Sequence, residues 1–518
     1  MRENAMNVSD SKIIHKKLYE LNKAEQFERF DMFITKKVWE KEKGRDISFA
    51  PMSKETKQRL REEAYLNFYR RVKVENVASR VTIKKWFGLN GYVRPKREQI
   101  FKLAFALSLD EEGLQEYLIK GIRQPGIQIN DYREMIYLYG LERALSYEDC
   151  VDMIRAFEVQ MYRNTVFAQS THTQQLWDMY RRNCNQPKEK FLSWMCKNAG
   201  FFKGYSKVAL KHFMEVKSEV LKYIRLNAKE QLFRALEETD FPVWAEQNGI
   251  APEEYGENIS RYIKNMSRRK ERGMLTETLK AGILKQNRIA YSARDKMTDL
   301  LAELYSSAVE SGKGPFQTKR IRYKDRTKFF LPDEIFFMTD KHMSQIISIA
   351  EQKEKEIRMS QALGSLEASE KTEGTCPEWI RDLLTGYGFQ PPKGAGQAKK
   401  FLRSALRTQK QRCHLVQRED LLPLIHYVAQ QRYDKMLQEQ GTDYQCEDAR
   451  IFFIQMADEI LSECQMAPVN ETYQLDYLLL SCYMEEDMYS LADIIEAAEK
   501  EETGYIQKPE NAGTAFVE

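Results

Sequence analysis

The sequence has no paired cysteines and no metal-binding spacing. Its eight cysteines are scattered along 518 residues without a C-x-x-C pair, and its six histidines show no ligand pattern. We therefore expect reduced, mostly buried thiols and no bound metal. The hydrolase and metalloprotease signatures G-x-S-x-G and H-E-x-x-H are also missing. With no residue pattern to support catalysis, we expect a binding protein and not an enzyme, with no catalytic residues and no cofactor.

Long apolar runs are missing too. No stretch reaches the roughly 18 apolar residues that a membrane-spanning helix needs. The opening residues, MRENAMNVSDSKIIHKK, lack the apolar centre of a signal peptide. We therefore expect no membrane partner and a cytoplasmic location.

Proline and glycine are scarce, with 14 and 24 residues in the whole chain. Together with 42% apolar and 31% charged residues, this composition excludes fibrous and disordered classes and is typical of helix-rich globular proteins. The chain is also too long for one ordinary core. We therefore predict an all-α, multi-domain protein.

Breaks in the helical pattern divide the chain. Gly44 and Pro51 interrupt the three- and four-residue apolar spacing, and the run QALGSLEASEKTEGTC at 361–376 is small and polar with no periodicity. The predicted units are a helical segment 1–50, a small helical domain 53–122, a helical middle region 123–360, a linker 361–376 and a helical C-terminal domain 377–518. The helices beyond residue 122 are expected to form bundles or a helical array.

Charge is unevenly distributed, although the net charge is only +4. Residues 54–122 hold 15 Lys/Arg against 9 Asp/Glu, and residues 261–328 hold 18 against 7. Residues 441–518 hold 3 against 18. The two basic zones favour a polyanionic partner. The acidic C-terminal end favours a basic partner, or contact with the basic zones of the same chain.

The most informative stretch is 79–121, SRVTIKKWFGLNGYVRPKREQIFKLAFALSLDEEGLQEYLIKG. Its first residues predict a short helix with basic residues on one side and an apolar core side. The core side is expected to consist of Val81 or Thr82, Ile83, Trp86 and Phe87. A basic loop and a Pro-headed helix follow. Ser108 with Glu111 then has the S-x-x-E pattern of a capping box, which predicts another helix.

Over about residues 53–122 this order resembles the XRE/Cro-type, lambda-repressor-like helix-turn-helix family. The matching residues are Ser79, Thr82, Ile83, Trp86, Arg94, Pro95, Leu103, Ala104, Leu107 and Ser108. The resemblance implies a bacterial or phage transcription regulator that binds double-stranded DNA, as a homodimer where it reads two half-sites. It implies that base edges are read by Arg80, Val81 and Lys84, and that phosphates are held by Ser79, Lys85, Arg94, Lys96 and Arg97.

Two other features leave alternatives open. The second basic zone contains two strong basic runs, at 267–272 and 319–328, with the side chains Arg268, Arg269, Lys270, Lys319, Arg320, Arg322 and Lys324. These suit either nucleic-acid contact or a solvated surface. The C-terminal helical region is expected to sense or bind a protein partner. The alternative function is a helical interaction scaffold, in phage defence or mobile-element control, whose XRE-like fold contacts protein.

Overall fold

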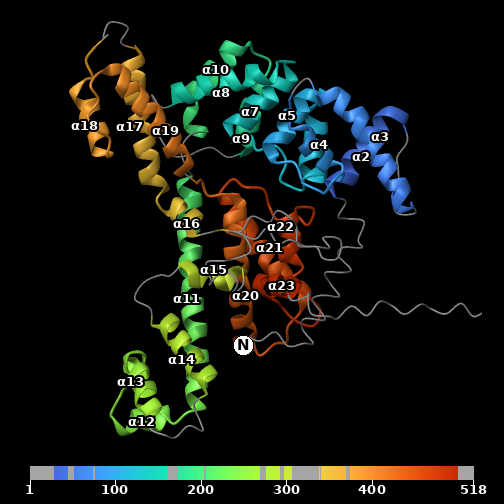
Figure 1. Ribbon diagram of the computed structural model, residues 1–518. Coiled ribbons are helices and arrows are strands. Elements are labelled where there is room, and N and C mark those ends of the chain that lie inside the picture. The colour runs from blue at the N-terminus through green and yellow to red at the C-terminus, as the bar shows by residue number, and fades with distance from the viewer. Residues whose placement is uncertain are drawn as a thin grey trace, which may run out of the picture.

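Helices dominate the computed structural model, which describes residues 29–44, 49, 52–73, 76–161, 173–202, 206–268, 276–291, 297–305, 338, 340–368, 374–412 and 414–499. Within this part of the chain the single β feature is an isolated antiparallel bridge between Tyr483 and Met488. The predicted all-α fold is confirmed (Figure 1). Among the described helices, none is long and apolar enough to cross a membrane.

The first helices form a unit that we call the five-helix module. It consists of α2 (Phe30–Lys43), α3 (Lys54–Val72), α4 (Arg80–Trp86), α5 (Arg97–Leu107) and α6 (Glu111–Glu116), which continues as the π-helical turn η2 (Tyr117–Gly121). Ser79 begins α4, because its hydroxyl accepts a hydrogen bond from the Thr82 amide at 3.1 Å. The predicted cap at Ser108 is wrong. Ser108 ends α5 with a left-handed φ of 52°, and the Asp110 carboxylate caps α6 by accepting from the Gly113 amide at 2.8 Å.

Helix α2 belongs to the core of this module. The Phe30 ring meets the Trp86 ring of α4 edge-on, with centroids 6.4 Å apart, and Phe68 of α3 meets Phe87 at 5.2 Å. All four rings are buried. The predicted boundary between residues 50 and 53 therefore does not separate two cores. The first 28 residues of the predicted segment 1–50 lie outside the described part of the chain.

Four more helices extend the same core: α7 (Tyr132–Glu142), α8 (Tyr147–Met161), α9 (Thr173–Asn183) and α10 (Lys188–Lys197), followed by the 3-10 turn η3 (Ala199–Phe201). The Ser146 hydroxyl accepts from the Asp149 amide at 3.0 Å, and the Asp149 carboxylate accepts from the Ser146 amide at 3.2 Å. This reciprocal capping box begins α8. Farther along, Tyr139 of α7 stacks on Phe191 of α10 with ring centroids 4.0 Å apart.

The long helix α11 (Lys207–Glu237) joins two further cores (Figure 1). Its last turns bury Leu232 and Leu236 against a small group formed by α12 (Phe241–Gln247), the 3-10 turn η4 (Pro252–Glu254), α13 (Tyr255–Arg268) and α14 (Glu277–Ala290). Its earlier turns belong to a larger core, which we call the C-terminal core. This core also contains α15 (Met297–Tyr305), α16 (Asp340–Ile347), α20 (Arg418–Gln440), α21 (Cys446–Glu463), α22 (Gln474–Leu480) and α23 (Leu491–Glu499).

The predicted linker 361–376 is wrong over its first half. Residues 361–368 are the last turns of α17 (Ile349–Ala368), because Ala362 and Leu366 are buried in a core with Leu402. This separate core also contains α18 (Glu378–Gly386) and α19 (Ala395–Arg412). The predicted domain 377–518 is therefore divided. Its first two helices share a core with α17, and α20 to α23 share the C-terminal core with α11.

Candidate nucleic-acid interface

Helix α4 turns one side into the core and the other side to solvent. Ile83 and Trp86 are buried, whereas Arg80 is exposed and the Val81 side chain is 64% exposed. A spacing of three residues places Ile83 and Trp86 on the same face of the helix, and Lys84 at its margin is partly exposed. The structure thus brings the three predicted base readers onto one accessible side of a firmly packed helix.

Two tyrosines of α3 hold the cations of α4. Tyr65 and Tyr69 stack with ring centroids 5.7 Å apart. Arg80 Nε donates to the Tyr65 hydroxyl at 3.3 Å, and the Arg80 guanidinium lies 5.6 Å from the Tyr69 ring centroid. Lys84 Nζ lies 5.8 Å from the Tyr65 centroid. Such cation–π contacts restrict the two side chains while leaving their charge outward. The hydrogen bond with Tyr65 also raises the pKa of Arg80 above its ordinary value.

These two tyrosines were not among the residues predicted from the sequence. The signal was present, because Tyr65 and Tyr69 are four residues apart and so share a helix face. What the sequence did not indicate was that this face would lie beside α4.

The connection between α3 and α4 covers residues 73–79 and is longer than the turn of about 3–4 residues usual in a helix-turn-helix. Val77 is buried, and Asn76 takes a left-handed φ of 46°. Asparagine tolerates this conformation better than most residues. Lys102 Nζ donates to the Asn76 carbonyl at 3.1 Å. The position of α4 therefore depends on its core contacts and not on a tight glycine turn.

Exposed basic side chains adjoin this connection. Arg70 and Lys73, at the end of α3, are exposed and were missed in the sequence prediction. Their charge suits the C-terminal end of a helix. Of the predicted phosphate contacts, Lys96 is exposed, Lys85 is partly exposed, and Ser79 is exposed although its hydroxyl caps α4.

Arg94 has an internal role. Its Nη1 donates to the Ile122 carbonyl at 2.8 Å and to Oε1 of Gln474, the first residue of α22. The Gln474 amide in turn donates to the Arg123 carbonyl at 3.3 Å. This guanidinium therefore joins the five-helix module to the C-terminal core. The prediction that Arg94 holds a phosphate is corrected accordingly. The side chain of Gln474 is uncharged, so this contact is not an ion pair between the acidic C-terminal end and a basic zone.

Arg97 is likewise used inside the protein. Its Nε and Nη2 donate to the two carboxylate oxygens of Glu134 at 2.6 and 2.8 Å. Nη1 and Nη2 donate to the carbonyls of Pro125 and Gly126, each at 2.6 Å. The side chains of Arg97 and Glu134 are 20% and 8% exposed. The planar guanidinium matches this set of acceptors. The prediction that Arg97 binds phosphate is therefore corrected as well.

The same arrangement recurs in the C-terminal core. Arg418 Nη1 donates to Asp476 Oδ1 at 2.6 Å, and Nη2 also bonds to the second oxygen of that carboxylate. Arg418 Nε and Nη2 donate to the carbonyls of Ala467 and Pro468 at 2.7 and 2.8 Å. Arg97 and Arg418 are each the first residue of their helix. In both places an arginine at the start of a helix binds the backbone carbonyls of a loop that lies farther along the chain.

The two basic runs of the second basic zone, 267–272 and 319–328, lie almost wholly outside the described residues. Arg268 is the last residue of α13, but its side chain is not described. The other predicted side chains of this zone, which lie outside the described residues, are Arg269, Lys270, Lys319, Arg320, Arg322 and Lys324. Within the described ranges, no group of three or more His, Cys, Asp or Glu side chains could hold a metal ion.

Comparison with known proteins adds no relative. No protein-family model matches the chain, and neither a curated protein nor a solved structure matches it.

Proposed function

We propose that the protein is a DNA-binding transcription regulator of XRE-like type, whose five-helix module contacts double-stranded DNA through the outer side of α4. The observation that carries the proposal is the construction of this helix. Ile83 and Trp86 anchor it, and Arg80 and Lys84 lie over tyrosine rings with Val81 beside them. Arginine and lysine donate to the guanine acceptors of the major groove, and an apolar side chain contacts the thymine methyl group.

Phosphate contacts in this proposal come from the exposed residues around α4. Lys85 and Lys96 remain from the predicted set with Ser79, and Arg70 and Lys73 join them. Each neutralised phosphate steepens the fall of affinity with salt. A homodimer would place two copies of α4 on two half-sites. The helical cores beyond residue 202 would then serve to bind a partner or effector.

A salt series of binding measurements on genomic fragments, with random DNA as competitor, tests the proposal. Arg80→Ala and Lys84→Ala are each expected to weaken binding to the selected site by about 1–3 kcal/mol, roughly tenfold to hundredfold. Lys85→Ala should instead weaken all sequences alike and lower the slope of log K against log salt by about 1. Arg59→Ala is the matched control, because Arg59 is exposed on α3 and lies six positions before Tyr65.

The proposal fails if no fragment survives competition, or if Arg80→Ala and Lys84→Ala leave a selected site bound as tightly as before. Light scattering of the complex measures the expected two chains per site.

The scaffold alternative is favoured by two exposed apolar side chains. Val81 is 64% exposed and Leu66 of α3 is 50% exposed, and a protein partner would bury both. In that case Val81→Asp and Leu66→Asp abolish recovery of one partner protein from cell extract, whereas Arg80→Ala leaves DNA affinity at its unspecific level. Sequence-specific DNA binding lost in Arg80→Ala contradicts this alternative.

A further inference from the structure

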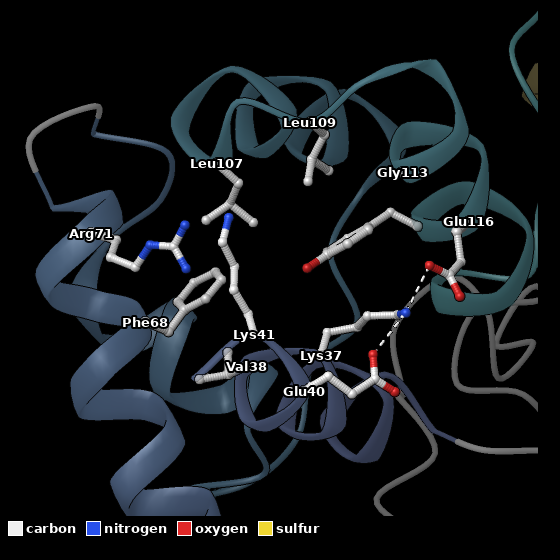
Figure 2. Close-up of a pocket in the computed structure, with 11 residues that line it drawn as sticks. Lys37, Val38, Glu40, Lys41, Phe68, Arg71, Leu107, Leu109, Gly113 and Glu116 are labelled. Carbon is white, nitrogen blue, oxygen red and sulfur yellow. Dashed lines mark hydrogen bonds and ion pairs between the residues drawn. The ribbon is translucent and has the colours of Figure 1, made fainter. Parts of the chain in front are cut away.

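The five-helix module contains a cavity of about 360 Å³ between α2, α3 and the segment that joins α5 to α6 (Figure 2). One part of its lining is apolar and is formed by Val38, Phe68, Leu107 and Leu109. The size lies at the lower end of the range for ligand pockets. The cavity is therefore suited to a small ligand with an apolar body.

The charged side chains of the lining form two groups, one whose members pair with each other and one whose members are cations without an ion pair among the described residues. Lys37 Nζ pairs with Glu40 at 3.0 Å and with Glu116 at 2.8 Å, so these two carboxylates already have a cation. Lys41 and Arg71 form no ion pair with any described residue. Figure 2 shows them on the side of the cavity away from Glu40 and Glu116. Three cations and two carboxylates leave one positive charge, which a monoanion would match.

The hydroxyl of a tyrosine completes the site. Tyr117 lines the cavity and is 6% exposed, and among the described residues its hydroxyl has no hydrogen-bond partner. Burial raises the pKa of this phenol, so the hydroxyl keeps its proton and remains a donor. An anionic oxygen between Arg71, Lys41 and Tyr117 would accept a hydrogen bond from this hydroxyl.

We propose that this cavity binds a small organic monoanion, in which a carboxylate is joined to an apolar or aromatic body. The carboxylate accepts hydrogen bonds from Lys41, Arg71 and the Tyr117 hydroxyl, and the body packs on Phe68 and Leu107. A dianion such as free phosphate is disfavoured, because Glu40 and Glu116 lie in the same lining.

Calorimetric titration of the full chain with 4-phenylbutyrate tests this site, with 4-phenylbutyramide as the uncharged probe. The carboxylate is expected to bind at one saturable site, and the amide at least tenfold more weakly. Lys41→Gln and Arg71→Gln should each weaken carboxylate binding about tenfold or more, as expected for a charge-assisted hydrogen bond. Leu109→Trp, which fills the cavity, should abolish binding. Arg59→Gln, a matched change on α3 outside the lining, should leave it unchanged.

Three results overturn the proposal. They are absence of saturable binding up to the solubility limit of the carboxylate, equal binding of the amide, and equal weakening in Arg59→Gln and Arg71→Gln. Lys41 and Arg71 are both exposed, so their variants should fold, and circular dichroism checks this.

Occupancy should also affect α4. Phe68 lines the cavity, and its ring meets Phe87 directly after α4 with centroids 5.2 Å apart. A shift of Phe68 on binding is therefore passed to α4. This second part depends on the proposed DNA binding and is measured separately, as DNA affinity with and without 4-phenylbutyrate. Failure to bind DNA leaves the calorimetric result standing, and failure of the calorimetric result leaves DNA binding untouched.

Discussion

Replacing Arg97 or Arg418 by methionine should destabilise different parts of the protein to different extents. Each substitution keeps most of the apolar stem but removes the guanidinium from its carboxylate and from two backbone carbonyls. The remaining carboxylate keeps one donor. The Gln128 amide donates to Glu134 at 2.7 Å, and the Asn470 amide donates to Asp476 at 2.7 Å. Both carboxylates then lack their opposite charge inside the protein.

The burial of each pair sets the size of the effect. Breaking a buried ion pair from one side costs about 3–5 kcal/mol. Arg97 and Glu134 are 20% and 8% exposed, whereas Arg418 and Asp476 are 5% and 0% exposed. We therefore expect about 3 kcal/mol for Arg97→Met and about 5 kcal/mol for Arg418→Met. Adding Glu134→Met to Arg97→Met should restore part of the loss, because it removes the unpaired charge.

Hydrogen exchange followed by mass spectrometry is the suitable assay, because a chain with several cores does not unfold in two states. The opening free energy should fall at amides of α5 and α7 in Arg97→Met, and at amides of α20 and α22 in Arg418→Met. Lys96→Met, next to Arg97 and exposed, is the control and should leave protection unchanged.

One result would refute this reasoning. If Arg97→Met leaves the protection of α5 and α7 intact while DNA affinity and its salt slope both fall, Arg97 is a phosphate contact. The internal role assigned to it would then be wrong.

Three further outcomes are expected. Burial lowers the pKa of His426 to about 3. Below about pH 6.5 the unfolded chain therefore binds a proton that the folded chain does not bind, and the free energy of unfolding decreases as the pH is lowered. His426→Leu should reduce the loss of stability between pH 7 and pH 5 by about 2 kcal/mol, measured by hydrogen exchange in α20. Gly140→Ala places a Cβ 2.1 Å from Cys150 Sγ and should lower the opening free energy of α7 and α8 by about 1–3 kcal/mol. Gln474→Ala removes an acceptor from Arg94. It should lower the opening free energy of amides at residues 122–126 and in α22 by about 1 kcal/mol, with the amides of α13 as the internal control.

Local patterns predicted much of α4. The Ser79 cap and the buried side formed by Ile83 and Trp86 depend on residues within one or two turns, and such short-range relations are visible in a sequence. The roles of Arg94 and Arg97 depend on partners far along the chain. Glu134 is 37 positions from Arg97, and Gln474 is 380 positions from Arg94. A basic cluster before a helix therefore resembled an outer surface, because nothing nearby indicated the loop and helix that cover it.

Composition misled the prediction in the segment 361–368. Small and polar residues there suggested a linker, but burial of Ala362 and Leu366 in a core with Leu402 stabilises the end of α17. Helix α2 shows the opposite case, because its own apolar pattern was recognised while its packing on Trp86 was not. In both cases the missing information was which helix lies alongside, and that is decided by tertiary packing.

The arginine arrangement of Arg97 recurs at Arg418, and this explains why Arg97 and Lys96 have different roles although they are neighbours in the sequence. In each copy the residue before the arginine caps the helix, and its amide donates to the side chain three residues later, Gln99 at 2.8 Å or Asp420 at 2.9 Å. The arginine that follows then points its guanidinium to the returning loop, and the cap residue stays outside. In each copy the third α-helix after the arginine's own helix, α8 or α23, begins with a Ser-Asp capping box, at Ser146 and again at Ser490. An arginine in the first helical position of this arrangement is thus a structural residue, and the DNA-binding surface that we propose consists of the exposed cations around α4.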